Sequence, residues 1–276
     1  MEPTLAPPVL DIAGVGKTYV STRTGESIEA LRGVDLQVRR GEFLAVVGPS
    51  GCGKSTLLSL VAGFAAPTTG TVRFKGREVR EPEPARGVMF QDYALFPWRT
   101  VLGNVEFGPF ARGVDRTRRR ERAGDLIRLV GLEGFEHRYP HELSGGMRQR
   151  CALARMLANE PELWLMDEPL AAVDLQTRMI LQDELLRLWG DSAAGGGTGE
   201  RPTVLFVTHG IDEAVLLADR IVVLGRRPGR LKAVVEVDLP RPRTDARTSP
   251  AFTRLVEHVW SLIRDEAVRA IAEETN

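Results

Sequence analysis

The chain has 276 residues, and its 37 Lys and Arg residues balance its 37 Asp and Glu residues, so the formal net charge at pH 7 is zero. With 43% hydrophobic and 6% aromatic residues, this is the composition of an ordinary globular protein. Zero net charge disfavours a protein that wraps nucleic acid, because such binding usually depends on a strongly basic face. We therefore expect no nucleic-acid partner.

The cysteines and the hydropathy pattern bear on the compartment. Cys52 and Cys151 are too few for a disulfide framework, and their spacing forms no metal-binding pair, which is typical of a reducing compartment. The N-terminus lacks the basic and apolar regions of a signal peptide, and no stretch approaches the roughly 18 apolar residues of a membrane span. We expect a chain that is neither exported nor membrane-spanning by itself.

The first forty residues predict an antiparallel sheet with one solvated face. Residues 9–13 and 30–38 alternate apolar and polar side chains around the turn-prone segment 21–25. Residues 43–47 then form a continuous apolar run, which is typical of a buried strand, and a helix is expected over residues 54–62.

Farther along the chain, short apolar runs alternate with helical periodicity, which predicts an α/β fold with a mostly parallel sheet. The expected strands are residues 163–166, 203–207 and 221–224, and the expected helices are residues 174–189 and 211–218. Residues 92–159 are mainly helical and strand-poor, which indicates a helical subdomain inserted into the α/β core. The Gly-rich segment 190–201 predicts a flexible surface loop.

The C-terminal tail, residues 243–276, predicts an amphipathic helix. Ser249 and Pro250 suit the N-cap and the first helical position. Apolar residues then recur at helical spacing, namely Phe252, Leu255, Val256, Val259, Leu262 and Ile263. Such a helix most often packs on its own domain, and the alternative is a helix that binds a partner.

Residues 48–56 match the phosphate-binding pattern G-x-x-x-x-G-K-[ST] between a predicted strand and a predicted helix. The glycines let backbone N–H groups curl around phosphate oxygens, and the helix N-terminus adds positive potential. We expect Lys54 to reach the β- and γ-phosphates of a nucleotide and Ser55 to ligate Mg²⁺. The other residues of the loop are Gly48, Pro49, Ser50, Gly51, Cys52, Gly53 and Thr56, among which Cys52 occupies a variable position.

Two acids and a histidine follow predicted strands. Asp167 and Glu168 end the strand that begins at residue 163, and His209 ends the strand 203–207. Because the carboxyl ends of parallel strands line the ligand crevice, Asp167 suits a phosphate-bound Mg²⁺, Glu168 an attacking water and His209 the γ-phosphate. Each residue type is usually structural when it stands alone, and the upstream phosphate-binding loop favours the functional interpretation.

A second glycine-bearing helix start precedes the apolar helical run 151–157. Ser144, Gly145 and Gly146 at this start form a second candidate anion site. If the helical subdomain projects from the core, this site cannot easily reach the phosphates held by residues 48–56. A second copy of the chain could supply it.

These motifs together resemble those of ABC transporter ATP-binding subunits, over residues 9–242. Residues 48–56 correspond to the Walker A loop, 143–150 to the signature, 163–168 to Walker B, Gln91 to the Q-loop glutamine and His209 to the switch histidine. The resemblance implies an α/β P-loop fold of the ABC ATPase type. It would have an N-terminal antiparallel β-subdomain, an inserted helical subdomain at about residues 92–159 and a separate tail at 243–276.

The resemblance also implies how two copies of the chain would bind ATP and Mg²⁺. Tyr19 would stack on adenine, and each ATP would be completed in trans by Ser144, Gly145, Gly146 and Asp174 of the other copy. The metal ligands would be Ser55, Gln91 and Asp167, and the catalytic residues Glu168, His209, Lys54 and Gln91. The chain departs from the usual family pattern at Gly210 and at Ala-Ala-Val in residues 171–173.

A finer resemblance is to importers of the nitrate, sulfonate, taurine and bicarbonate type. It is carried by residues 87–101 and 209–220, by Arg-Pro-Gly-Arg at 227–230 and by Pro-Arg-Pro-Arg at 240–243. It implies an ATP-hydrolysing subunit, peripheral on the cytoplasmic face of the inner membrane. This subunit would energise uptake of a small anion through separate membrane permease subunits and, indirectly, an extracytoplasmic substrate-binding protein.

Two other functions compete with transport. A soluble ABC ATPase that acts on DNA or the ribosome usually carries a long coiled-coil insertion or two ABC units, and the sequence has neither. A P-loop kinase or GTPase would not need residues 143–150. The basic run 116–122 is typical of a solvated helix face because acidic and apolar residues follow it, and anionic lipid or nucleic acid is the alternative.

Overall fold

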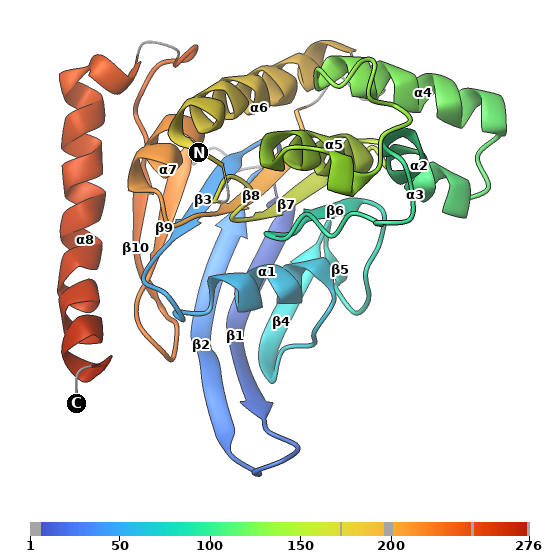
Figure 1. Cartoon of the computed structure of the whole chain (residues 1–276). Coiled ribbons are helices and arrows are strands. Elements are labelled where there is room, and N and C mark those ends of the chain that lie inside the picture. The colour runs from blue at the N-terminus through green and yellow to red at the C-terminus, as the bar shows by residue number, and fades with distance from the viewer. Residues whose placement is uncertain (1–6, 172, 196–200, 244–245, 275–276) are drawn as a thin grey trace. The chain divides into compact units, whose positions relative to one another are not determined.

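The computed structural model of the chain describes residues 7–171, 173–195, 201–243 and 246–274 (Figure 1). It divides into two compact units, one formed by residues 1–82 with 192–276 and the other by residues 83–191. The phosphate-binding loop belongs to the first unit and the signature to the second. Each unit is therefore described by itself.

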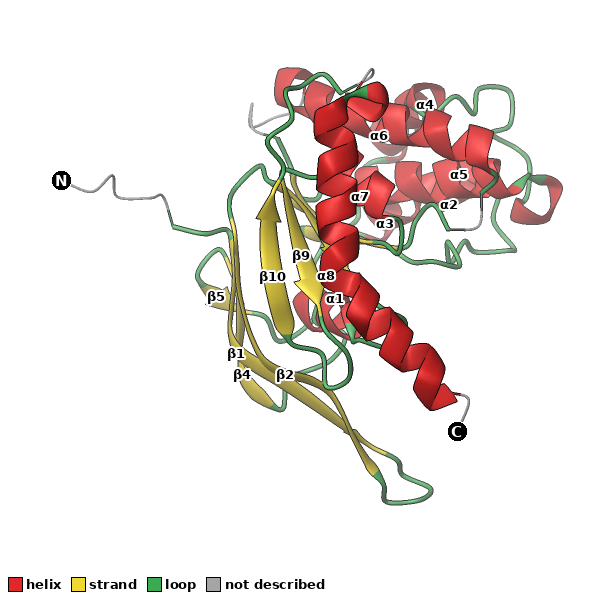
Figure 2. Ribbon diagram, turned by 90° about the vertical axis from the view of Figure 1, so that its left-hand side faces the viewer, coloured by secondary structure: helices red, strands yellow, loops and turns green. Residues whose placement is uncertain are grey.

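An antiparallel sheet with the strand order β2-β1-β4-β5 forms one layer of the first unit (Figure 2). Its strands are β1 (Leu10–Val20), β2 (Ser27–Val38), β4 (Thr69–Phe74) and β5 (Arg77–Glu78). Along β1, the apolar residues Leu10, Ile12 and Val15 are buried, and Asp11, Ala13 and Gly14 between them are more accessible. The predicted antiparallel sheet with alternating burial is thus confirmed.

The second sheet of the first unit is built around β3 (Phe43–Val47). This strand pairs in parallel with β8 (Thr203–Val207) on one side and with β9 (Arg220–Leu224) on the other. β10 (Leu231–Glu236) pairs antiparallel with β9. Every residue of β3, β8 and β9 is buried, which explains why these strands are apolar runs in the sequence apart from Thr203 and Arg220 at the first positions of β8 and β9. Helix α1 (Lys54–Ala62) follows β3, and α7 (Ile211–Leu217) follows β8.

The predicted tail helix is α8 (Pro250–Glu274), which packs on the first unit. Phe252 N donates to Ser249 Oγ at 3.2 Å, as expected of an N-cap. Phe252, Val259 and Ile263 are buried, and the helix contacts α7, β9 and β10. The apolar stripe of α8 therefore packs on its own domain, which was one of the two arrangements that the sequence allowed.

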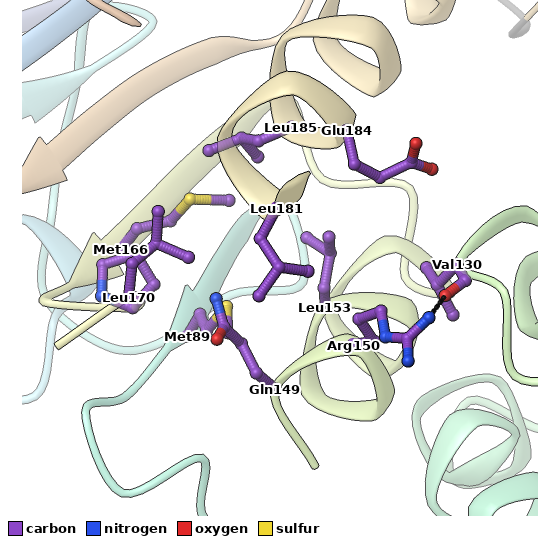
Figure 3. A pocket seen from close by; sticks show the side chains of 11 residues that line it. Met89, Val130, Gln149, Arg150, Leu153, Met166, Leu170, Leu181, Glu184 and Leu185 are labelled. Atoms are coloured by element: carbon purple, nitrogen blue, oxygen red, sulfur yellow. Dashed lines mark hydrogen bonds between the residues drawn. The ribbon is translucent and has the colours of Figure 1, made fainter. Parts of the chain in front are cut away.

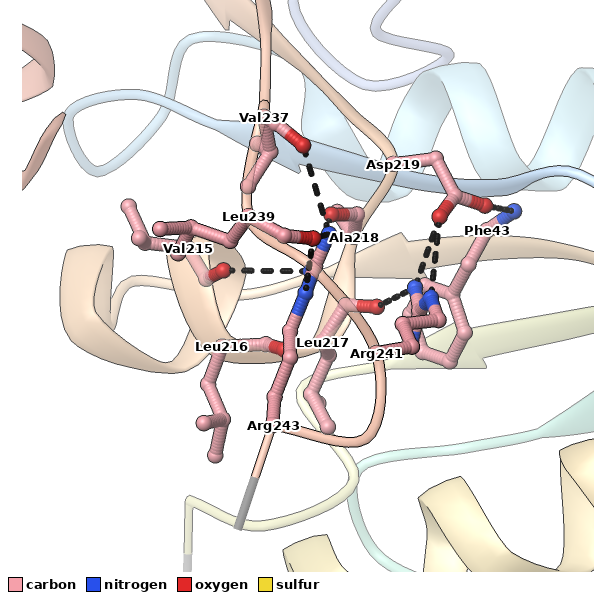
Figure 4. A network of polar contacts seen from close by, with 10 residues as sticks. All are labelled: Phe43, Val215, Leu216, Leu217, Ala218, Asp219, Val237, Leu239, Arg241 and Arg243. Carbon is pink, nitrogen blue, oxygen red and sulfur yellow. Dashed lines mark hydrogen bonds and ion pairs between the residues drawn. The ribbon is translucent and has the colours of Figure 1, made fainter. Parts of the chain in front are cut away.

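Two arginines, Arg241 and Arg243, bind the segment that precedes α8 to neighbouring residues of the first unit (Figure 4). Arg241 forms an ion pair with Asp219 at 2.7 Å. Arg243 is buried, and burial lowers its pKa to about 10, so the guanidinium is still charged at neutral pH. Its N–H groups donate to five backbone carbonyl oxygens, those of Val215, Leu216, Ala218, Val237 and Leu239. Three of these carbonyls, those of Val215, Leu216 and Ala218, lie at the end of α7, where carbonyl oxygens have no N–H donor within the helix.

The second unit is mainly helical and contains one parallel strand pair. β6 (Arg86–Met89) pairs with β7 (Leu163–Asp167). The chain between these strands forms the helices α2 (Val101–Val105), α3 (Phe107–Ala111), α4 (Arg116–Leu129) and α5 (Gly145–Leu157). The residues expected to form the helical subdomain, about 92–159, thus lie inside this unit, which also includes the strand pair and most of α6 (Leu175–Gly195).

Helix α6 corrects one prediction. The Gly-rich segment 190–201 was expected to be a loop, but residues 190–195 continue the helix, and residues 196–200 lie outside the described part of the chain. Leu188 and Trp189 are both buried just before this segment. A glycine in a helix costs only about 1 kcal/mol, so the packing of the preceding turns outweighs the weak helix propensity of the segment.

Candidate nucleotide-binding site

The phosphate-binding loop, residues 48–56, joins β3 to α1. Gly51 and Gly53 have φ of 72° and 96°, a backbone conformation that glycine adopts without strain. A Cβ atom on Gly53 would lie 2.6 Å from Leu31 Cδ2, so a side chain there would displace β2 or the loop. The loop can fold in this way because glycine stands at these positions.

Lys54 is the buried cation of the loop. Lys54 is 5% exposed, and its Nζ donates to Gly48 O at 2.9 Å and to Pro49 O at 3.2 Å. The same Nζ lies 3.4 Å from Nδ1 of His209, which follows β8. Since β3 and β8 are parallel neighbours, their carboxyl ends bring these two predicted site residues together.

A hydrogen-bonded turn supports His209. Thr208 is buried, and its hydroxyl donates to the carboxylate of Glu213, which is also buried. Gly210 N donates to Thr208 Oγ1 at 3.0 Å. These bonds fix the backbone on both sides of the exposed His209. Thr208 and Glu213 were not among the predicted site residues. The signal that the sequence offered for Glu213 was an acid in the first turn of the predicted helix.

The remaining predicted residues of the first unit differ in exposure. Ser50, Gly51 and Ser55 are exposed, whereas Cys52 is buried. Tyr19 on β1 is 43% exposed, and the Nζ of Lys17 lies 5.0 Å from the centre of its ring. An exposed aromatic face of this kind can stack on a nucleobase.

The signature residues open α5 in the second unit. Ser144 is the N-cap, and its Oγ accepts from Met147 N at 3.3 Å. Gly146 is buried, and a Cβ atom there would lie 2.9 Å from Thr177 Cγ2. Since the first N–H groups of a helix have no acceptor within it, this start can bind an anion.

The loop that contains Gln91 is tied to the same helix. Tyr93 and Ala94 follow Gln91 with φ of 62° and 43°, which is uncommon for residues with a side chain. Arg155 of α5 donates to both of their carbonyl oxygens, at 2.7 and 2.6 Å. Burial lowers the pKa of Arg155. The signature helix and the Gln91 loop thus form one hydrogen-bonded assembly, and the sequence carried no signal for the role of Arg155.

The predicted acids lie at the end of β7 and just before α6. Asp167 is the last residue of β7, and Glu168 follows it with φ of 48°, the kind of backbone strain that is frequent at functional sites. Asp174 Oδ1 accepts from Thr177 N at 3.0 Å, and this hydrogen bond lowers the pKa of the carboxyl group. Ala172, one of the departures from the family pattern, lies outside the described residues.

The candidate residues therefore form two sets. Tyr19, the phosphate-binding loop and His209 belong to the first unit, and Gln91, the signature and the acids belong to the second. The oxygen atoms of Ser55, Gln91 and Asp167 are the kind of hard ligands that Mg²⁺ takes, so the donor chemistry fits this ion. In the described part of the chain, no cluster of three His, Cys, Asp or Glu side chains could hold a metal by itself.

The second unit also contains a cavity of about 20 Å³ beside α6 (Figure 3). Its walls are mainly apolar, and the buried Oε1 atom of Gln149 has no hydrogen-bond partner among the described residues. The volume suits one water molecule and is far below that of a ligand pocket. The cavity is therefore not a nucleotide site.

Comparison with known proteins identifies the family of the chain. The sequence profile of the ABC transporter family matches residues 31–171. An uncharacterized ABC transporter ATP-binding protein, MJ0412 of Methanocaldococcus jannaschii, is 51% identical over 92% of this chain and 91% of its own. The chain belongs to the ABC transporter family. It is an ATP-binding subunit of that family and an ABC-type ATPase.

Two other members define the fold and the group. The taurine import ATP-binding protein TauB of Jannaschia sp. is 42% identical over 87% of this chain and 89% of its own. The dimeric ATP-binding cassette MJ0796, solved in a post-hydrolysis state with ADP and Pi, superposes with a TM-score of 0.70 at 31% identity. It covers 84% of this chain, and all of that cassette is matched. The predicted ABC-type α/β fold and the resemblance to the importer group are thus confirmed.

Among the described residues, no helix combines the length and the apolar character that crossing a membrane requires.

Proposed function

We propose that two copies of this ABC ATPase subunit bind ATP between them and energise the import of a small anion such as taurine, another sulfonate, nitrate or bicarbonate. The observation that carries the ATP site is the contact of Lys54 and His209 beside the glycine-bearing loop. Separate permease subunits would form the membrane path, with a substrate-binding protein outside. The chain would act on the cytoplasmic face of the inner membrane.

The first unit would supply most of the binding of ATP. Backbone N–H groups of residues 48–56 and the start of α1 surround the phosphates, and Lys54 exchanges its bonds to Gly48 O and Pro49 O for bonds to phosphate oxygens. Tyr19 stacks on the adenine ring. These contacts orient the γ-phosphate toward His209.

Hydrolysis would follow when water attacks the γ-phosphorus in line with the bond to ADP. Glu168 takes a proton from this water, the bond between the γ-phosphorus and the bridging oxygen breaks, and ADP leaves. Lys54 and His209 bind the γ-phosphate oxygens and stabilise their charge. Mg²⁺, when bound by Ser55, Gln91 and Asp167, neutralises further phosphate charge.

The second copy would complete each site with Ser144, Gly145, Gly146 and Asp174. Closing of two copies around ATP and reopening after hydrolysis would shift the permease between two access states. The helical part of the second unit is our proposed docking surface for the permease. The bonds from Arg155 to the Gln91 loop support this coupling, because a shift of the signature helix would move that loop.

The Glu168→Gln variant tests the general base. It should bind ATP as tightly as the wild type, remain dimeric with ATP in gel filtration and hydrolyse ATP at least about 100-fold more slowly, as expected for the loss of a general base. Glu133→Gln, at an exposed acid of the same unit, is the matched control and should keep full activity. Wild-type hydrolysis by Glu168→Gln would exclude this residue as the base.

Uptake measurements test the substrate class. Deletion of the gene should abolish ATP-dependent uptake of one radiolabelled anion among taurine, nitrate and bicarbonate, and plasmid-borne wild type should restore it. Unchanged uptake of all three, with intact ATPase activity, would contradict the proposed substrates. It would favour the soluble ABC ATPase if the protein also fails to co-purify with a permease.

A further inference from the structure

The turn between β9 and β10, residues 225–230, packs against the phosphate-binding loop. A Cβ atom on Gly229 would lie 2.0 Å from Cys52 O, and one on Gly48 would lie 2.6 Å from Leu224 O at the end of β9. These two glycines let the backbones of the turn and the loop approach each other closely. The turn thus packs directly against the backbone of the phosphate-binding loop.

Backbone hydrogen bonds also hold the turn on β2. Gly229 N donates to Ala30 O at 2.9 Å, and Arg32 N donates to Gly229 O at 2.9 Å. Gly225 N donates to Arg230 O at 2.9 Å and closes the turn. The backbone of Arg227 is therefore fixed, and its side chain can move only about its own bonds.

The guanidinium of Arg227 lies beside the loop. Its Nη2 is 3.7 Å from the position that a Cβ atom on Gly51 would occupy, and the side chain is exposed. In the described part of the chain, no ion pair or hydrogen bond is formed by this guanidinium. Arg230, in the same turn, lies near Glu29. The pKa of the Glu29 carboxyl is lowered mainly by Arg32 and more weakly by the charge of Arg230.

The position of Arg227 matches the expected phosphate chain. Lys54 donates to Pro49 O, two residues before Gly51, and this lysine is the residue expected to reach the β- and γ-phosphates. A guanidinium can donate two parallel hydrogen bonds to phosphate oxygens. The positive charge of the guanidinium is screened only beyond about 8 to 10 Å at ordinary salt, so it would stabilise phosphates even without a direct bond.

We propose that Arg227 is a further nucleotide-binding residue, which donates to the β- and γ-phosphates of ATP held by the loop of its own copy. This inference rests on the proposed ATP site. It gives a binding role to the Arg-Pro-Gly-Arg segment, which has no role in the proposed function.

Fluorescence titration of the full chain with ATP, ADP and AMP tests this role. Arg227→Ala should weaken ATP and ADP binding about 5- to 10-fold, as for an exposed charge-assisted bond, and leave AMP binding unchanged. Arg227→Lys should keep much of the affinity, and the matched control Arg230→Ala should keep all of it. The dependence of log Kd on log salt should become shallower in Arg227→Ala.

Two outcomes would overturn the inference. Arg227→Ala with the affinities of the wild type would exclude a contact with phosphate. An equal loss for ATP, ADP and AMP, with a lowered melting temperature, would assign Arg227 a purely structural role. The Lys54→Ala variant distinguishes a failure of the proposed ATP site from a failure of the role of Arg227. If the wild type and Lys54→Ala bind ATP equally, the ATP site itself is contradicted.

Discussion

The two glycine-bearing helix starts, at α1 in the first unit and at α5 in the second, are capped differently. The N-cap of α1 is Gly53 in a left-handed conformation, with no side-chain cap, and the buried Lys54 follows it. The N-cap of α5 is Ser144 in an extended conformation, and its hydroxyl accepts one of the backbone N–H groups of the helix.

The two caps differ in how many N–H groups they leave for an anion. The α1 start offers its N–H groups to a ligand and adds the ammonium of Lys54, so it can hold phosphates within one copy. The α5 start already uses one donor for its own cap. We therefore expect it to bind phosphate weakly by itself and to act on ATP that another copy holds.

The largest expected contrast is between Lys54→Ala and Ser144→Ala. Lys54→Ala should weaken ATP binding by dilute protein at least about 50-fold, because it removes a charged partner of the phosphates. Ser144→Ala should leave that binding within about twofold but slow hydrolysis about fivefold, because its proposed site lies across the dimer and the lost helix cap costs about 1 kcal/mol. ATP titration and steady-state hydrolysis measure the two effects.

The outcome that would break the contrast is equal loss of ATP binding in both variants. It would mean that the two starts act on the same nucleotide within one copy. Hydrolysis that stays first-order in protein down to high dilution would point the same way.

A smaller effect concerns the opposite end of a helix, where Arg243 satisfies the last carbonyls of α7. Arg243→Met should lower the free energy of unfolding by about 3 kcal/mol, because several buried carbonyl oxygens lose their donor. The ATP affinity of the folded protein should not change, because the C-terminal end of α7 is not part of the proposed ATP site. Urea unfolding measures this loss.

Arg254→Met, at an exposed arginine of α8, is the matched control for Arg243→Met and should change stability by less than about 0.5 kcal/mol. Equal stability of the two variants would contradict the capping role of Arg243. A large loss of ATP affinity in folded Arg243→Met would show that this end of α7 also positions His209.

The smallest effect concerns the two cysteines, Cys52 in the loop before α1 and Cys151 in the middle of α5. Burial raises the pKa of Cys151 on α5 to about 12, so only about one thiol in 10,000 is ionised at pH 8. In the Cys52→Ser variant, iodoacetamide should therefore leave the native protein unmodified at pH 8 and alkylate it once urea unfolds it. Mass spectrometry measures the label, and rapid native alkylation would contradict the tight packing of this helix.

Local patterns predicted most of the strands and helices that carry the site. The apolar runs of β3, β8 and β9 have the bounds expected or nearly so, because strands buried on both faces need apolar residues at nearly every position. The end of α6 could not be predicted in this way. Its Gly-rich residues are helical because the buried residues before them pack, and packing is not visible in local composition.

Residue types at short, regular spacing were enough to predict the family and to select the candidate residues of the two helix starts. Which distant groups meet could be read only from the folded chain. Lys54 contacts His209, Arg155 holds the Gln91 loop, and Arg227 lies beside Gly51. Such contacts depend on how strands and turns pack, since a long side chain can reach many neighbours and its own sequence does not select one.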